Sequence, residues 1–236
     1  MCQQIKAAKA AFPHTIPVLI GYVFMGIAFG ILLSSKGFSF GWAILMAVTV
    51  FSGTMQFVAI NFLTGPFSML YIVLMGLMVN CRYTFYGISM LERFQGMGWR
   101  KPYMIFALTD ETYSLICTTK APDGVDEKWF LFFIAFLNHL YWIAGCTIGA
   151  LAGSFIAFNT KGIDFVMTAL FVVILVDQWK ATKNHLSAVI GLAGTLVCLA
   201  LFGPDQFVLA SMVLIVTLLT VFRKRLEATQ EAAVCL

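Results

Sequence analysis

The stretch that decides the fold runs from residue 37 to residue 81 and reads GFSFGWAILMAVTVFSGTMQFVAINFLTGPFSMLYIVLMGLMVNC. Its 45 residues include no Asp, Glu, Lys or Arg. A helix needs about 20 predominantly apolar residues to cross the hydrocarbon core of a bilayer, so this stretch is long enough for two passes. Residues 10–35 and 129–160 are also uncharged. The sequence therefore predicts an all-α membrane protein that crosses the bilayer several times.

The composition excludes the soluble classes of protein. Of the 236 residues, 61% are hydrophobic and 11% are charged, whereas soluble domains have roughly 45–50% apolar and about 25% charged residues. This excludes a soluble enzyme, a nucleic-acid-binding protein and a secreted disulfide scaffold. The net charge of +4 comes from Lys and Arg at the ends of apolar segments, as the positive-inside rule expects. Six scattered cysteines and three histidines without metal-site spacing predict no disulfide, metal or cofactor.

Turn residues and charges divide the apolar sequence into eight segments. The expected spans are residues 13–34, 41–63, 68–91, 129–157, 164–179, 185–202 and 206–222, with a short fourth segment at 103–119. Residues 1–222 are expected to form a single transmembrane domain, and residues 223–236 a polar cytoplasmic tail. The first apolar stretch follows two lysines as in a signal peptide, but it has no clear cleavage site and is expected to remain as a span.

The segment at 103–119 decides the predicted topology. It carries Asp110 and Glu111 near its middle, which makes it a poor span. If it crosses, eight passes leave the N-terminus inside and place nine Lys and Arg in the cytoplasm against five outside. If it is broken or re-entrant, seven full passes leave the N-terminus outside, and the ratio becomes eleven to three. The positive-inside rule favours the second arrangement. Both place the C-terminus in the cytoplasm.

A candidate internal repeat links residues 26–30 (GIAFG) to residues 145–149 (GCTIG), because each is followed by a Lys-Gly turn and an apolar run. The first three spans and the spans from 129 to 202 would then be inverted copies, a recurrent device for alternating access. Chance similarity is nearly as good an explanation. The glycines recur every four residues, which favours close packing of two helix backbones over a mobile gate.

Polar residues within the predicted span 41–63 form the first candidate site. Residues 51–57 read FSGTMQF, and the spacing of Ser52 and Gln56 places them on one helix face. Gly53 could break the helix there and leave backbone groups free for a ligand, as unwound helices do in several transporters. Alternatively, Ser52 bonds to its own helix and Gln56 to a neighbouring one.

Arg82 is the second candidate, since it follows 45 uncharged residues and precedes nine more. Arginine at the centre of a membrane helix costs at least about 2.5 kcal/mol, so it should face protein or water. Its planar fork suits a carboxylate, either of a substrate or of a nearby acid. Snorkelling to the interface beside Tyr83 and Tyr86 is the less favoured alternative.

Asp110 and Glu111 form the third candidate. Adjacent helical residues point about 100° apart, so the two acids are expected to do different jobs. One could exchange a proton, and the other could hold an ammonium group or pair with Arg82. A charged surface loop is the alternative, but apolar residues flank the pair. His139 is a weaker proton-relay candidate, for which a hydrogen-bonded core histidine is the better interpretation.

Together these motifs resemble one family. Residues 51–57 are similar to its A-G-x-x-Q-F box, residues 80–87 (NCRYTFYG) to its N-x-R-H-x-x-Y-G box, and residues 109–113 (TDETY) to its T-D-E box. The resemblance covers roughly residues 12–222. The family is AzlC/YgaZ, the large subunit of bacterial branched-chain amino acid exporters. Ser52 replaces the family's Ala, and Tyr83 replaces the His that often follows the Arg, which puts proton coupling in doubt.

The resemblance implies a secondary transporter rather than an enzyme. It would export valine, leucine and isoleucine, with methionine as a further candidate, across the bacterial inner membrane, driven by the proton gradient. A small, separately encoded AzlD/YgaH-type membrane subunit would be its partner. The hypothesis assigns substrate binding to Ser52, Gly53, Gln56, Asn80, Arg82, Asp110 and Glu111, and proton coupling to Asp110, Glu111 or His139.

Two other classes of function stay open. Ser52 near His139 could imitate the dyad of an intramembrane serine hydrolase, although no G-x-S-x-G elbow supports it. A channel or a non-transporting scaffold subunit is the other class. A channel would need a continuous polar stripe, and these spans are too apolar to show one.

Overall fold

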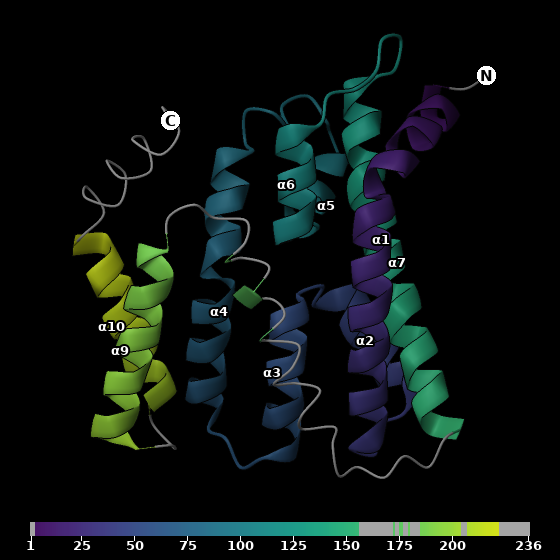
Figure 1. The fold of residues 1–236 in the computed structure, drawn as a ribbon. Helices are drawn as coiled ribbons and strands as arrows, with labels where there is room; N and C mark the ends of the chain where they lie inside the picture. The colour runs from purple at the N-terminus through teal and green to yellow at the C-terminus, as the bar shows by residue number, and fades with distance from the viewer. Residues whose placement is uncertain are drawn as a thin grey trace. The chain divides into compact units, whose positions relative to one another are not determined.

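The structure is a computed structural model and describes residues 3–155, 172, 175–176, 179, 185–203 and 207–221. The described residues form helices and connecting loops without strands (Figure 1), so the predicted all-α class is confirmed. The chain divides into two compact units, Met1–Val166 and Met167–Leu236. Most of the predicted span 164–179 and the whole predicted tail 223–236 lie outside the described residues.

The helices of the first unit are α1 (Gln3–Ser35), α2 (Phe40–Thr49), α3 (Gly53–Thr64), α4 (Met69–Ser89), α5 (Arg100–Phe106), α6 (Asp110–Thr118) and α7 (Glu127–Phe155). The second unit contains α9 (Leu186–Phe202) and α10 (Phe207–Val221), which pack against each other. Among the described helices, α1, α4 and α7 are long and apolar enough to cross a membrane.

Helices α1 and α7 run parallel and meet along their glycines. A Cβ atom on Gly26 would lie 2.8 Å from the Cys146 backbone nitrogen, and one on Gly145 would lie 2.9 Å from the Val23 carbonyl oxygen. Further along both helices, Gly153 faces the backbone of Ile31. The prediction of close packing is therefore confirmed. Inverted copies would run antiparallel, so the prediction that these two glycine motifs belong to inverted repeats is wrong.

The segment predicted as one span at 41–63 is broken into two half-helices. Helix α2 ends at Thr49, α3 begins at Gly53, and Phe51 between them has a φ of 39°. Helix α2 starts after the turn that closes α1 and lies along α7. Helix α3 then runs back antiparallel to α4 (Figure 1), with Ser52 opposite Asn80 and Phe62 near Tyr71. The prediction of a single continuous helix is therefore wrong, the break considered at Gly53 is present, and residues 40–64 form a helical hairpin.

The short segment at 103–119 is broken as well, as the favoured prediction held. Helix α5 lies along α7, with Arg100 over the Trp129 ring at one end and Phe106 5.8 Å from the His139 ring at the other. After a break at Ala107–Thr109, α6 returns beside α4, where the rings of Tyr113 and Tyr86 stack at 4.4 Å. Helices α5 and α6 therefore form a second helical hairpin, whose open end lies where α7 begins.

The tips of the two hairpins meet in the middle of the first unit. The Phe51 ring of the first tip lies 6.3 Å from the Phe106 ring beside the second tip. Tyr22 of α1 contacts both, with its ring 6.3 Å from that of Phe51 and its hydroxyl 2.5 Å from Thr109 Oγ1. The His139 ring of α7 packs 4.2 Å from the Phe51 ring. The two hairpins thus approach each other from opposite sides between α1, α4 and α7.

Candidate functional site

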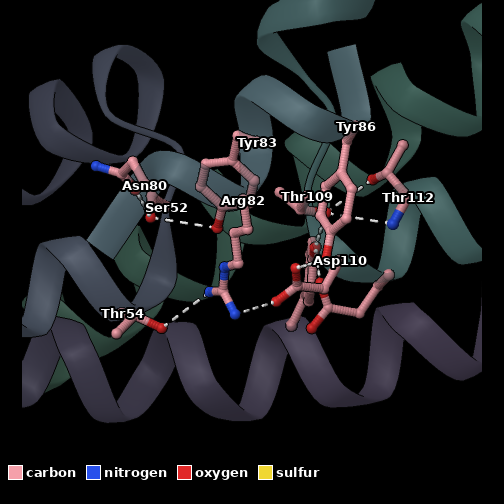
Figure 2. Close-up of polar contacts among 11 residues, drawn as sticks. Ser52, Thr54, Asn80, Arg82, Tyr83, Tyr86, Thr109, Asp110 and Thr112 are labelled. Carbon is pink, nitrogen blue, oxygen red and sulfur yellow. Dashed lines mark hydrogen bonds and ion pairs between the residues drawn. The ribbon is translucent and has the colours of Figure 1, made fainter. Parts of the chain in front are cut away.

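An ion pair joins α4 to the second hairpin tip. Arg82 Nη1 lies 2.9 Å from Asp110 Oδ2, and Arg82 Nη2 donates to Thr54 Oγ1 of α3 at 3.5 Å. The Tyr86 hydroxyl donates to Asp110 Oδ1 at 2.9 Å (Figure 2). The Arg82 and Asp110 side chains are 35% and 36% exposed. Two charges predicted from distant parts of the sequence therefore lie together, where a small polar molecule can reach them.

The T-D-E box positions its acids as the start of a helix. Thr109 is the N-cap of α6, and its side chain accepts a hydrogen bond from the Thr112 backbone N–H at 3.3 Å. Asp110 and Glu111 occupy the first turn, where carboxylates interact favourably with the helix dipole and the free backbone N–H groups. The local sequence thus explains why both acids lie at the tip of the hairpin.

Glu111 has different partners from Asp110, as the 100° offset predicts. Its Oε2 atom accepts a hydrogen bond from the Tyr22 hydroxyl at 2.7 Å. The Glu111 side chain is exposed, and no Lys or Arg pairs with it among the described residues. The site therefore has one paired and one unpaired carboxyl group.

Ser52 and Asn80 line an open cavity of about 500 Å³ between α4 and the two hairpin tips. The Ser52 hydroxyl donates to Asn80 Oδ1 at 3.0 Å and lies 3.3 Å from the Tyr83 hydroxyl. Much of the remaining lining is apolar and includes Phe106 and Leu108. Arg82 and Asp110 are not part of this lining. The cavity therefore offers an apolar surface with a few hydroxyl and amide groups, beside the ion pair.

Gln56 and Gly53 face α7 instead of this cavity. Gln56 is fully buried, and its Oε1 accepts a hydrogen bond from Trp142 Nε1 at 2.9 Å. A Cβ atom on Gly53 would lie 3.2 Å from the Trp142 ring. Gln56 and Ser52 therefore do not share a helix face, because Ser52 precedes the first residue of α3. The structure separates the predicted binding residues into a group around Arg82 and a group under Trp142.

His139 lies where the hairpins meet. Its Nδ1 atom is 3.0 Å from the Tyr103 hydroxyl of α5, and its Nε2 atom is 3.3 Å from the Ala47 carbonyl oxygen of α2. The side chain is 7% exposed. Both ring nitrogens thus have partners on different hairpins, which fits the hydrogen-bonded core histidine. Ser52 bonds elsewhere, to α4, so the geometry gives no support to a serine hydrolase dyad.

Several polar residues at the site escaped the sequence analysis. They are Tyr22, Thr54, Thr112 and Trp142. Tyr22 is the clearest case, since it contacts both Glu111 and Thr109. The available signal was a phenol in the middle of the uncharged stretch 10–35, one turn before the first of its paired glycines.

The fold and the site define an α-helical membrane protein in which an ion pair links a long apolar helix to the tip of a helical hairpin. The family model described as "AzlC protein" matches residues 17–156, which is more than half of the chain. The chain belongs to the AzlC family, as its motifs predicted.

Three relatives illustrate this membership. The chain is 49% identical to "Branched-chain amino acid transport protein AzlC" of Bacillus subtilis (strain 168), over 96% of this chain and 90% of the relative. It is 47% identical to an "Uncharacterized membrane protein" of Helicobacter pylori (strain ATCC 700392 / 26695), over 96% of this chain and 100% of the relative. It is 27% identical to "Inner membrane protein YgaZ" of Escherichia coli (strain K12), over 84% of each chain. No solved structure matches the chain.

Proposed function

We propose that the chain is a secondary transporter that exports branched-chain amino acids across the bacterial inner membrane. Valine, leucine and isoleucine are the expected substrates, with methionine as a further candidate, and the proton gradient is the expected driving force. The name of the Bacillus relative supports this class of substrate. By analogy with the family, a small AzlD/YgaH-type membrane subunit is the proposed partner.

The Arg82–Asp110 ion pair is the observation that carries this proposal. An amino acid has one carboxylate and one ammonium group, so it can replace one ion pair with two. Its carboxylate would bind Arg82 as a planar, bidentate partner, and its ammonium group would bind Asp110. The exchange leaves the net charge of the site unchanged, which keeps the cost of charge inside the membrane low.

The adjoining cavity suits the apolar part of such a substrate. Ser52 and Asn80 would lie near the backbone of the amino acid, while Phe106 and Leu108 offer apolar contacts to a branched side chain. The hairpin tips form the walls of this cavity and enter the unit from opposite sides. Small movements of either tip would therefore open the site toward one side of the membrane, as alternating access requires.

The distribution of charge supports a cytoplasmic N-terminus. Ring contact between His14 and Phe130 places the start of α1 beside the start of α7, and the Arg93–Glu127 ion pair places the end of α4 there too. In residues 3–155, apart from Arg82, seven Lys and Arg lie on this side, and Lys36 lies on the other. The positive-inside rule assigns the side with seven charges to the cytoplasm.

Two hairpins instead of one also improve the charge balance of the whole chain. With α1, α4 and α7 crossing, and with the predicted spans 164–179, 185–202 and 206–222 crossing after them, both termini are cytoplasmic. Of the fourteen Lys and Arg other than Arg82, twelve are then inside and only Lys36 and Lys161 are outside. This asymmetry exceeds that of the arrangement with an external N-terminus, and we propose it in place of that arrangement.

Transport of radiolabelled valine into vesicles that contain the full chain with its co-expressed small subunit tests the function. Arg82→Ala should abolish saturable valine movement, because the substrate carboxylate loses its partner. Arg100→Ala is the matched control, since Arg100 lies over Trp129 at the far end of α5 and should leave transport intact. If Arg82→Ala transports valine at the wild-type rate, with equal amounts of folded protein, Arg82 does not bind the substrate carboxylate.

A further inference from the structure

A row of five polar side chains leads from the exposed Glu111 into the protein core. The Tyr22 hydroxyl lies 2.7 Å from Glu111 Oε2 and 2.5 Å from Thr109 Oγ1. Thr109 Oγ1 lies 3.0 Å from Thr112 Oγ1, which accepts a hydrogen bond from Asn138 Nδ2, also at 3.0 Å. The four residues after Glu111 are at most 6% exposed. The row therefore connects α6, α1 and α7 with a single accessible end.

The number of hydroxyl protons allows this row two arrangements. Tyr22 and Thr109 carry one hydroxyl proton each, and a hydroxyl donates only one hydrogen bond. When Glu111 is ionised, Tyr22 donates to it and Thr109 donates to Thr112, so no hydroxyl proton is left for the contact between Tyr22 and Thr109. When Glu111 carries a proton, Glu111 donates to Tyr22, Tyr22 donates to Thr109, and Thr109 donates to Thr112. Every contact of the row thus holds a proton only when Glu111 is protonated.

The buried end of the row has the acceptor that the second arrangement needs. Asn138 Oδ1 is buried and has no hydrogen-bond partner in the part of the chain that the structure describes. Once Thr112 accepts from Thr109, its own proton needs a new acceptor. A half-turn of the Asn138 amide brings Oδ1 to the place of Nδ2 and supplies that acceptor. A buried oxygen without a hydrogen-bond partner is destabilising, and the flipped amide gives this oxygen a donor.

We propose that Glu111, rather than Asp110, takes up and releases a proton at this site, with Tyr22 as the positioning residue whose hydroxyl turns between Glu111 and Thr109. The proton comes from water at the exposed face of Glu111 and adds to a carboxylate oxygen. Hydronium loses this proton as the carboxyl O–H bond forms, and the Tyr22 hydroxyl then turns from Glu111 to Thr109, while no O–H bond within the row breaks. The use of this proton for transport rests on the proposed function, whereas the proton uptake itself does not.

The charges around the site separate the two acids. Arg82 of α4 pairs with Asp110, so those two charges already balance. An ionised Glu111 adds a net negative charge inside the membrane, which protonation removes. The titratable and charged groups that face this region are Tyr22 from α1, Arg82, Tyr83 and Tyr86 from α4, and Asp110 and Tyr113 from α6. The α7 residue that contacts the other members of the row is Asn138, which is neutral.

Infrared difference spectroscopy of the full-length chain in lipid vesicles, without substrate, tests this proposal. Each of the eleven Asp and Glu adds a carbonyl stretch as it takes up a proton, and Glu111, bonded to Tyr22, should contribute a separate band as the pH falls. Glu111→Gln should abolish this band, and Asp110→Asn should retain it. Tyr22→Phe should shift the frequency of the band, because the protonated carboxyl group loses its hydrogen-bond partner. Circular dichroism confirms that each variant is folded.

Tyr141→Phe is the matched control for Tyr22→Phe. The Tyr141 hydroxyl also makes a buried contact between α7 and α1, 3.1 Å from Thr15 Oγ1, but it is not part of the row. Its removal should leave the band where it is. A band that survives Glu111→Gln, a band lost in Asp110→Asn, or no band in the wild type would each overturn the proposal. Because substrate is absent, these outcomes are independent of whether valine is transported.

Discussion

Arg82 Nη1 and Asp110 Oδ2, separated by 2.9 Å, join the transmembrane helix α4 to the first turn of the half-helix α6. Both side chains are about one-third exposed, so water screens their attraction. Ion pairs of this kind contribute about 1 kcal/mol or less to stability. Stability alone therefore does not account for the pair, which fits its proposed role as a binding place for a zwitterion.

Replacement of Asp110 with Asn separates the contribution of the ion pair to stability from its proposed contribution to substrate binding. The amide keeps the shape of the side chain and can still accept from Tyr86, so the free energy of unfolding should fall by about 1 kcal/mol or less. Valine binding should weaken at least about tenfold, because a hydrogen bond to a charged group contributes about 1.5–3 kcal/mol. Calorimetric titration and chemical unfolding in lipid measure the two quantities.

Glu127→Gln is the control for Asp110→Asn. It removes the partner of the ion pair at the end of α4, where Glu127 Oε1 lies 3.3 Å from Arg93 Nη2. Valine binding should be the same as in the wild type. Equal valine affinity in Asp110→Asn and the wild type would contradict the assignment of the ammonium group to Asp110.

The glycine contact between α1 and α7 predicts a sharp contrast among substitutions. A methyl group on Gly149 would overlap the Ile27 backbone, which no rotamer change can relieve. Gly149→Ala should therefore lower the free energy of unfolding by about 3 kcal/mol, at the upper end of the usual cost of overpacking. Gly21→Ala, in the same helix pair, has nothing within 4 Å of its new methyl group and should be neutral or slightly stabilising. Equal stability of the two variants would contradict the backbone contact.

The first hairpin tip predicts that glycine is better tolerated than alanine at position 51. Phe51 has a φ of 39°, in the left-handed region, where residues with a Cβ atom are disfavoured by about 1–2 kcal/mol. Phe51→Ala and Phe51→Gly both lose the ring that packs on His139. Glycine costs roughly 0.4–1 kcal/mol more chain entropy than alanine, yet it removes the backbone strain. The free energy of unfolding of Phe51→Gly should thus be about 0.5–1 kcal/mol higher than that of Phe51→Ala. The opposite order would show that the backbone at the tip is not strained.

The sequence predicted the elements that depend on local chemistry. Two acids in the middle of a short segment indicated that residues 103–119 do not cross as one helix, and the structure confirms the break. An arginine in an apolar stretch indicated a carboxylate partner, and Asp110 provides it. Each of these predictions follows from the cost of a charge in the membrane, which a few residues determine by themselves.

The first hairpin could not be predicted in this way. Residues 41–63 are uncharged, and a break at Gly53 does not by itself distinguish a helix that continues across the membrane from one that turns back. Whether the two half-helices turn back on each other depends on contacts from distant parts of the chain, such as that of His139 with the Ala47 carbonyl oxygen. Tyr22 was missed for the same reason, because its partners Glu111 and Thr109 come from a hairpin almost ninety residues away.

Cysteine accessibility distinguishes the topology with two hairpins from both arrangements that the sequence suggested. Single cysteines replace Lys6, Lys36, Lys101 or Lys120 in a background without the six native cysteines, and intact cells are treated with a membrane-impermeant maleimide. The proposed topology places only Lys36 outside, so Lys36→Cys alone should be labelled. Eight passes would expose positions 36 and 101, whereas seven passes with an external N-terminus would expose position 6. Permeabilised cells, in which all four variants should react, show that the unlabelled positions were protected by the membrane and not by the fold.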